Sequence, residues 1–165
     1  MTEAFTAIGF YTFGLLAVGG AVGMVLARRL VHSALFLVAS FLGVAAVYLL
    51  LGADFLAVVQ LLIYAGAIMI LMLFAIMLTP KQIEVQRPGQ WAQRLAAGLV
   101  AVSFLAVAGL TMLGTRWPVA ASLPDQPTTE TIGRVMLSSY VLPFEMASVL
   151  LLAAMVGAIL IARED

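Results

Sequence analysis

The chain has 165 residues, of which 64% are hydrophobic and only 10% are charged. Soluble domains are about half apolar and about a quarter charged, so this composition excludes a globule folded in water. Eight basic and eight acidic residues give a net charge of zero, and no basic, aromatic-rich patch indicates nucleic acid binding. Cysteine is absent, which excludes disulfides, iron–sulfur ligation and thiol nucleophiles. The composition therefore predicts an all-α integral membrane protein.

Charge-free windows predict five membrane-spanning helices. A helix needs about 20 apolar residues to cross about 30 Å of hydrocarbon. We expect a single membrane domain over 1–165, with spans over about 4–27, 31–52, 55–78, 93–114 and 142–162. The long loop over about 115–141 is predicted to end in a short interfacial helix over 129–137.

The distribution of basic residues predicts which side of the membrane each end occupies. Lysine and arginine collect in short cytoplasmic loops. With the N-terminus outside, the outer side carries only Arg116 and Arg134, and the inner side carries Arg28, Arg29, Lys81, Arg87, Arg94 and Arg163. We therefore expect the N-terminus outside and the C-terminus in the cytoplasm.

The third span carries a tyrosine and three small residues near its centre. Tyr64 lies nine residues past Phe55, which is about 14 Å by helical rise. A phenol at that depth needs a partner in protein or water, because lipid offers none. Ala65, Gly66 and Ala67 follow it directly. They either allow a neighbouring helix to approach closely or loosen this helix so that it bulges or rotates.

Two further polar side chains belong to the same span. Gln60 precedes Tyr64 by four residues, so a regular α-helix would place both on one face. Its neutral amide is suited to bonds between helices or to a buried water. Asp54 follows the tight turn at Gly52 and is predicted to cap the third helix.

Glu145 is the one carboxylate inside a predicted span, and two interpretations of it stay open. An ionisable group at membrane depth is a candidate member of a proton path. Alternatively, Pro143 occupies the first position of the fifth helix and Glu145 the third, where a carboxylate accepts bonds from free N–H groups.

Small residues also recur at helical spacing outside the third span. Gly19 and Gly23 form such a pair in the first span, as do Ala153 and Gly157 in the fifth, and both pairs predict close helix contacts. No metalloprotease, phosphate-loop or serine-hydrolase motif is present, and no internal repeat is evident. This pattern favours a chain that packs inside a larger assembly over an autonomous transporter or channel.

The segment from Val59 to Leu78, with its tyrosine and Ala-Gly-Ala run, resembles the third helix of a known family. That family is subunit J of proton-pumping NADH:quinone oxidoreductase, respiratory complex I, the counterpart of mitochondrial subunit 6. Segments 29–35 and 132–153 resemble its second and fifth helices. Some members carry a glutamate where this chain has Gln60, which argues against a proton-relay role at that position.

The resemblance implies a non-catalytic subunit, multi-pass in a bacterial inner (plasma) membrane, that helps couple quinone reduction to proton translocation. It implies a π-bulge around Tyr64 and Gly66 whose rotation opens or closes a water path. FMN, iron–sulfur clusters and quinone would lie in partner subunits, and this chain would hold no cofactor. Expected neighbours are subunits A, H and K, the antiporter-like subunits N, M and L, and lipid. The electron donor, NADH, ferredoxin or a deazaflavin, stays open, and so does a purely structural scaffold role.

Overall fold

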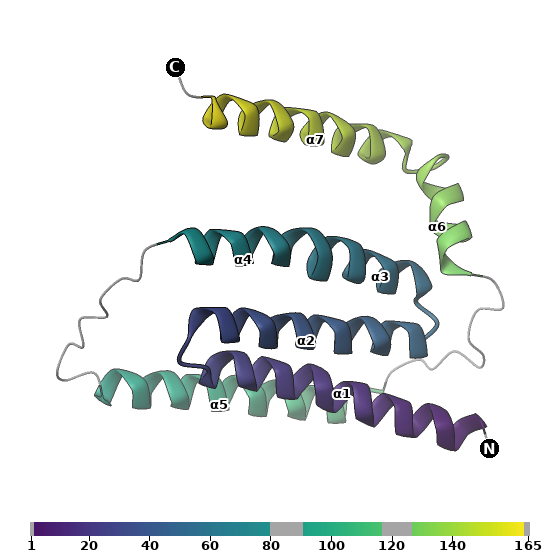
Figure 1. Cartoon of the computed structure of the whole chain (residues 1–165). Coiled ribbons are helices and arrows are strands. Elements are labelled where there is room, and N and C mark those ends of the chain that lie inside the picture. The colour runs from purple at the N-terminus through teal and green to yellow at the C-terminus, as the bar shows by residue number, and fades with distance from the viewer. Residues whose placement is uncertain (1, 80–90, 117–126, 164–165) are drawn as a thin grey trace. The chain divides into compact units, whose positions relative to one another are not determined.

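A computed structural model of the chain describes residues 2–79, 91–116 and 127–163 (Figure 1). All regular structure within these ranges is helical. Five of the described helices are long and apolar enough to cross a membrane: Ala4–Leu26, Leu30–Leu50, Asp54–Leu78, Trp91–Gly114 and Val141–Ala162. No bound differs from its predicted position by more than two residues, so the prediction of five apolar helices is confirmed.

The chain forms two compact units, one of residues 1–78 with 123–165 and one of residues 79–122. Two of the basic residues predicted on the inner side, Lys81 and Arg87, lie outside the described residues. Residues 117–126 of the predicted loop lie outside them as well. The elements are α1 (Thr2–Leu26), α2 (Leu30–Leu50), α3 (Asp54–Val59), η1 (Gln60–Ile68), α4 (Met69–Leu78), α5 (Trp91–Gly114), α6 (Thr128–Met136) and α7 (Val141–Ala162). The elements α3, η1 and α4 run on without interruption and together form the third helix.

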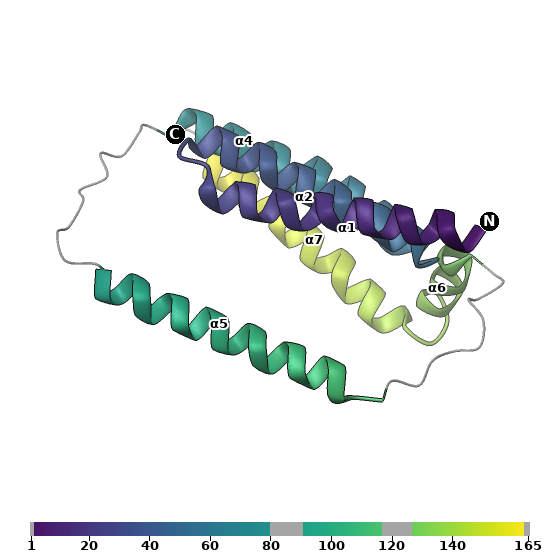
Figure 2. The ribbon, with the colours of Figure 1, turned by 90° about the horizontal axis from the view of Figure 1, so that it is seen from below.

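In the first unit, α2 lies between α1 and the third helix (Figures 1 and 2). Two serines of α2 donate their hydroxyl protons to carbonyl oxygens of α1. Ser33 Oγ lies 2.6 Å from the Met24 oxygen, and Ser40 Oγ lies 2.7 Å from the Ala17 oxygen. These bonds satisfy the hydroxyls inside the protein, which matters where lipid provides no partner.

Glycine allows α1 and α2 to approach closely. A β-carbon on Gly20 would lie 2.7 Å from the backbone nitrogen of Ser40, and one on Gly43 would lie 2.6 Å from the backbone nitrogen of Ala17. Both distances are shorter than any ordinary non-bonded contact. The hairpin of α1 and α2 therefore depends on the missing side chains at these two positions.

The predicted pair Gly19 and Gly23 takes a different part in this contact. A β-carbon on Gly23 would lie 2.6 Å from the Phe36 ring of α2. Gly19 is exposed, with no described atom within 4 Å of that position, and its neighbour Gly20 lies in the interface instead. The spacing of small residues therefore predicts which turn of α1 contacts α2, but it does not predict which of two adjacent glycines lies in the interface.

The turn between α2 and α3 is closed by Gly52, whose φ of 72° is left-handed. The N–H of Gly52 donates to the carbonyl of Leu49 at 3.1 Å, and the N–H of Ala53 donates to that of Tyr48 at 2.9 Å. This pair of bonds is the Schellman arrangement, in which glycine at the left-handed position carries no β-carbon penalty. The motif ends α2 and starts the third helix within three residues.

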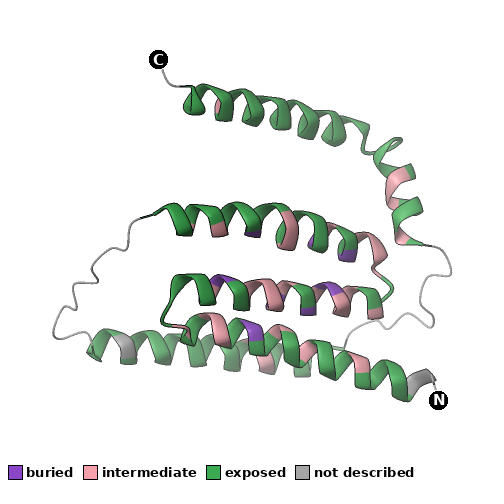
Figure 3. Cartoon of the chain, viewed as in Figure 1, coloured by how far each residue is buried: buried purple, intermediate pink, exposed green. Residues whose placement is uncertain are grey.

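Few residues are buried, and they lie mainly on α2 and the third helix (Figure 3). The apolar side chains of α5 and α7 are almost all exposed. A helix that is apolar on every side is stable only against lipid or other apolar helices. The exposure of α5 and α7 in the isolated chain is therefore typical of membrane-embedded helices.

A short helix, α6, precedes the last span, where the sequence predicted one over 129–137. It begins after Pro127 and carries an exposed ion pair, with Arg134 Nη2 at 3.0 Å from Glu130 Oε1. The helix is confirmed, and its interfacial position stays a prediction.

Candidate functional site

The centre of the third helix is π-helical over the nine residues of η1. Bonds in a π-helix run from a residue to the one five positions before it, and the N–H of Met69 donates to the carbonyl of Tyr64 in this way. Long π-helical segments are rare, and π-bulges within α-helices are frequent at functional sites. The π-helical segment lies where the resemblance implied a π-bulge.

Gly66 lies within η1 against the backbone of the preceding turn. A β-carbon at this position would meet the carbonyl oxygen of Leu61 at 3.1 Å. Leu61 precedes Gly66 by five residues, so the close oxygen is the one that π-helical spacing places next to it. Any larger residue at Gly66 requires this carbonyl to shift by a few tenths of an ångström.

Tyr64 connects η1 to α2 through its ring. The ring contacts Phe41 edge to face, with centroids 5.6 Å apart and planes at 72°. This geometry is favoured by the quadrupoles of the two rings and contributes about 0.5–1.5 kcal/mol beyond burial. The side chain is 44% exposed, and the described residues offer no hydrogen-bond partner for its hydroxyl. The hydroxyl is therefore available to water or to a neighbouring subunit.

Gln60 is buried, with only 8% of its surface exposed, whereas Tyr64 is nearly half exposed. The Tyr64 ring nevertheless contacts Phe41 of α2, and the expectation that Gln60 and Tyr64 lie on one face stays a prediction. The described residues contain no hydrogen-bond partner for the Gln60 amide.

The two most deeply buried residues of the third helix flank η1. Ala57 and Met69 are each 1% exposed, one before η1 and one after it. Between Gln60 and Met69 no residue of η1 is buried: Ala65 and Gly66 are half-buried, and Ala67 is exposed. The third helix therefore packs on α2 through α3, η1 and α4, with its deepest burial at the residues that flank η1.

Asp54 does not cap its own helix, contrary to the prediction. The N-cap position of α3 is Ala53, whose side chain makes no capping hydrogen bond. The Asp54 carboxylate instead accepts bonds from the N–H groups of Thr128, at 2.7 Å, and Thr129, at 3.1 Å, which open α6. The partners lie 74 and 75 residues along the chain, beyond the reach of any local sequence signal.

Glu145 lies on α7, away from η1. The helix begins at Val141, so Pro143 is its third residue and Glu145 its fifth. The interpretation of Glu145 as a third-position cap was therefore wrong. The first turn of a helix has no acceptors for its N–H groups, so proline fits at its third position as well as at its first. The Glu145 side chain is exposed, and α7 contacts only α6 among the described elements.

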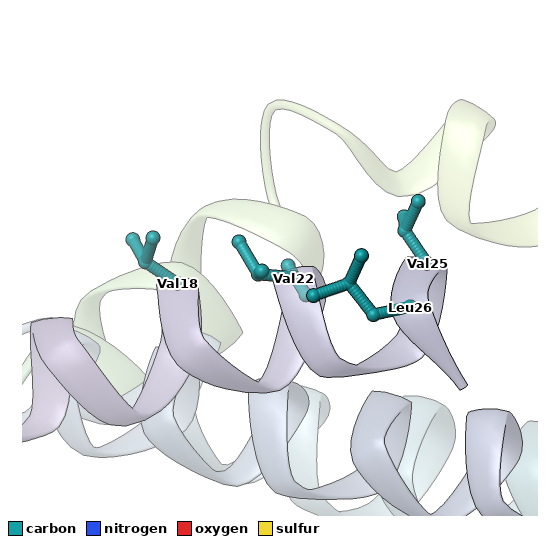
Figure 4. Close-up of a pocket in the computed structure, with 5 residues that line it drawn as sticks. Val18, Val22, Val25 and Leu26 are labelled. Atoms are coloured by element: carbon teal, nitrogen blue, oxygen red, sulfur yellow. The ribbon is translucent and has the colours of Figure 1, made fainter.

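The described residues contain no group of three histidine, cysteine, aspartate or glutamate side chains that is able to hold a metal. An apolar hollow of about 400 Å³ lies along α1, lined by Ala21 and by four side chains that project from one side of the helix (Figure 4). These four are Val18, Val22, Val25 and Leu26. With no polar group to orient a ligand, this surface is typical of packing against lipid or another helix.

The family model for NADH-ubiquinone/plastoquinone oxidoreductase chain 6 matches residues 20–161. The chain is 42% identical over 167 residues to NAD(P)H-quinone oxidoreductase chain 6 of Synechocystis sp., covering 100% of this chain and 84% of that protein. It is 40% identical over 165 residues to F(420)H(2) dehydrogenase subunit J of Methanosarcina mazei, covering 93% and 90%. It is 37% identical over 155 residues to the chloroplastic NAD(P)H-quinone oxidoreductase subunit 6 of Zygnema circumcarinatum, covering 88% and 86%.

These matches extend over nearly the whole chain, including α2, the third helix and α7. They confirm the resemblance that the tyrosine and small-residue run of η1 indicated. The chain belongs to the family of NADH-ubiquinone/plastoquinone oxidoreductase chain 6, which is subunit J or 6 of respiratory complex I.

Proposed function

We propose that this chain is a membrane subunit of a quinone oxidoreductase complex that couples quinone reduction to proton translocation through a change in η1. The observation that carries the proposal is the nine-residue π-helical segment at the centre of an otherwise α-helical span. Conversion of η1 to α-helix rotates everything that follows it, because each π-helical turn holds about one residue more than an α-helical turn. The rotation turns Tyr64 and α4 relative to α2.

Four residues are proposed for the coupling or proton path. Gly66 permits the close carbonyl of the π-helical form, and Tyr64 offers a free hydroxyl near the midplane. Gln60 is a buried polar group in the same segment, and Glu145 is the exposed carboxylate of α7. Because the Glu145 carboxylate makes no hydrogen bond or ion pair in the described part of the chain, its partner in the complex would come from another subunit.

The remaining small residues are proposed as contacts with other subunits. Gly19 and Gly157 have no described atom within 4 Å of a β-carbon position, and Ala67 is exposed. Exposed small residues on a membrane helix let a second helix approach closely. Ala65 is half-buried and Gly23 already contacts α2, so these two are proposed to fix the helices within the chain.

The assembly proposed around this chain is the membrane arm of complex I. Subunits A, H and K would be neighbours, with the antiporter-like N, M and L subunits beyond, and the chain would act as a non-catalytic part of a single membrane domain. FMN, iron–sulfur clusters and quinone would bind to other subunits. The proposed location is a bacterial plasma membrane, with the N-terminus outside. The electron donor is set by other subunits, in keeping with relatives whose names specify NAD(P)H or F(420)H(2).

The experiment is Gly66→Val in the assembled complex. We expect coupled quinone reduction and proton pumping to fall about tenfold. The valine side chain would strain the π-helical form of η1, and a strain of about 1.4 kcal/mol corresponds to a tenfold change in rate. Donor oxidation with an artificial acceptor should stay at the wild-type rate. The matched control is Gly98→Val on α5, where a β-carbon meets no described atom within 4 Å.

Unchanged pumping in an assembled Gly66→Val complex would contradict the coupling role. A scaffold role predicts a different result, in which every damaging variant loses assembly and every assembled variant pumps normally. Assembly is measured by native gel electrophoresis of the same membranes.

A further inference from the structure

We infer that Asp54, Thr128 and Thr129 form a latch that holds α3 on α6, so that a rotation arising at η1 is transmitted to α4. This inference rests on the proposed function for the rotation, and on the hydrogen bonds between α3 and α6 for the latch itself. Asp54 is the first residue of α3, and the two threonines are the first residues of α6. The two helix starts lie side by side in both views (Figures 1 and 2).

The hydrogen bonds of the latch use every acceptor site of one carboxylate. Oδ1 of Asp54 accepts from the N–H and the hydroxyl of Thr128, and Oδ2 accepts from the N–H and the hydroxyl of Thr129. A carboxylate has about four such sites, two on each oxygen. The Asp54 side chain is therefore fully occupied by α6.

One further bond runs in the opposite direction. The N–H of Phe55 donates to Thr128 Oγ1 at 3.2 Å, so this hydroxyl accepts one bond while donating another to Asp54. Each helix thus supplies an acceptor for free N–H groups of the other. The negative carboxylate also lies at the positive N-terminal ends of both helices, which stabilises it there. Separation of α6 from α3 breaks all five bonds together.

The position of the latch decides where a change in η1 has its effect. Only residues 55–59 of α3 lie between Asp54 and η1, and Ala57 among them is buried. One end of the third helix is therefore fixed against both α6 and α2. On the other side of η1, α4 contacts α2 but has no contact with α6 or α7 among the described elements. A rotation at η1 therefore turns α4, the less restrained part.

The first experiment is Asp54→Asn in the assembled complex, with hydrogen exchange of a peptide that contains Thr128 and Thr129 and begins at least two residues before them. An amide side chain has the same shape but keeps only one acceptor oxygen. We expect the Thr128 and Thr129 amides to exchange about tenfold faster. The matched control is Glu130→Gln, which removes an exposed carboxylate from the same helix and should leave these rates unchanged. Equal exchange in Asp54→Asn and wild type would overturn the latch.

The second measurement is the number of protons translocated per quinone reduced. Asp54→Asn should lower this ratio, because α3 is then free to move with η1, whereas Glu130→Gln should not. Faster exchange with a normal ratio, alongside a defective Gly66→Val complex, would refute the transmitting role and leave the proposed function intact. A normal ratio in both variants would refute the proposed function, and the inference with it.

A cysteine pair provides an independent test, because the chain has no cysteine of its own. The variant is Asp54→Cys with Thr128→Cys. When reduced, it lacks the latch and should have the low ratio of Asp54→Asn. When the two thiols are oxidised to a disulfide, α3 is again held on α6 and the ratio should recover. Further inhibition by the disulfide would mean that α3 must leave α6 during turnover, which the inference excludes.

Discussion

Adjacent glycines in α1 show how much one residue position matters at a helix contact. Gly20 is buried, and a β-carbon there would lie 2.7–2.9 Å from backbone atoms of Phe36 and Ser40. Backbone atoms of a packed helix yield far less than the end of a flexible side chain. Gly19 is exposed and meets nothing within 4 Å. The two positions share their residue type and helix and differ mainly in what they face.

We expect Gly20→Val to separate α1 from α2 and Gly19→Val to leave them together. Overpacking of a tight contact costs about 1–3 kcal/mol, and the Ser40 bond to the Ala17 oxygen would lengthen as well. The measurement is thermal unfolding of the full-length chain in detergent, followed by circular dichroism. Equal midpoints for the two variants would show that the helices do not approach as closely as the structure indicates.

Tyr64 combines two properties that substitution is able to separate. Its ring packs edge to face on Phe41, and its hydroxyl has no partner in the described part of the chain. We expect Tyr64→Phe to keep most of the coupled quinone reductase rate and Tyr64→Ala to lose about 0.5–1.5 kcal/mol of packing with a severalfold lower rate. The rate is measured in membrane vesicles with a proton-gradient dye. If Tyr64→Phe is as slow as Tyr64→Ala, the hydroxyl itself carries the function.

At the scale of the elements, charge-free windows were sufficient to predict the helices. Spanning the membrane imposes a minimum length on each apolar run, so the bounds follow from where charged and turn residues interrupt it. Gly52 illustrates this, because it ends α2 through a left-handed turn that only glycine adopts freely. The short helix α6 was also predictable, since its apolar residues recur at helical spacing.

The failures in the candidate site share a physical cause, which is that they depend on long-range or irregular geometry. The Asp54 carboxylate accepts hydrogen bonds from residues 74 and 75 positions away, and no local sequence pattern predicts such a partner. Glu145 was placed too early in α7, since proline is compatible with any position of the first turn. The π-helical segment itself was expected only from the family resemblance.

For the whole molecule, the arrangement of helices does not determine which side of the membrane each terminus occupies, and the distribution of basic residues predicts it. If all five apolar helices of the described ranges cross the membrane, the two termini lie on opposite sides, and the basic residues favour a cytoplasmic C-terminus. A fluorescent reporter that folds only in the cytoplasm, fused after Asp165, should be bright. A periplasmic phosphatase fused at the same position should be inactive. An active phosphatase with a dark fluorescent fusion would reverse the proposed topology.

The contacts of the first unit differ greatly in sequence separation, and this has a consequence for biogenesis. The hairpin of α1 and α2 joins helices that are neighbours in sequence, so it can form as soon as both have left the ribosome. The bonds between Asp54 and Thr128 close a loop of 74 residues that includes all of α5. The Asp54 carboxylate therefore has no partner in α6, and is hydrated instead, until α5 has been inserted and α6 has been synthesised. A chain truncated before α6 would lack both the threonine donors to the Asp54 carboxylate and the acceptor for the Phe55 N–H at the start of the third helix.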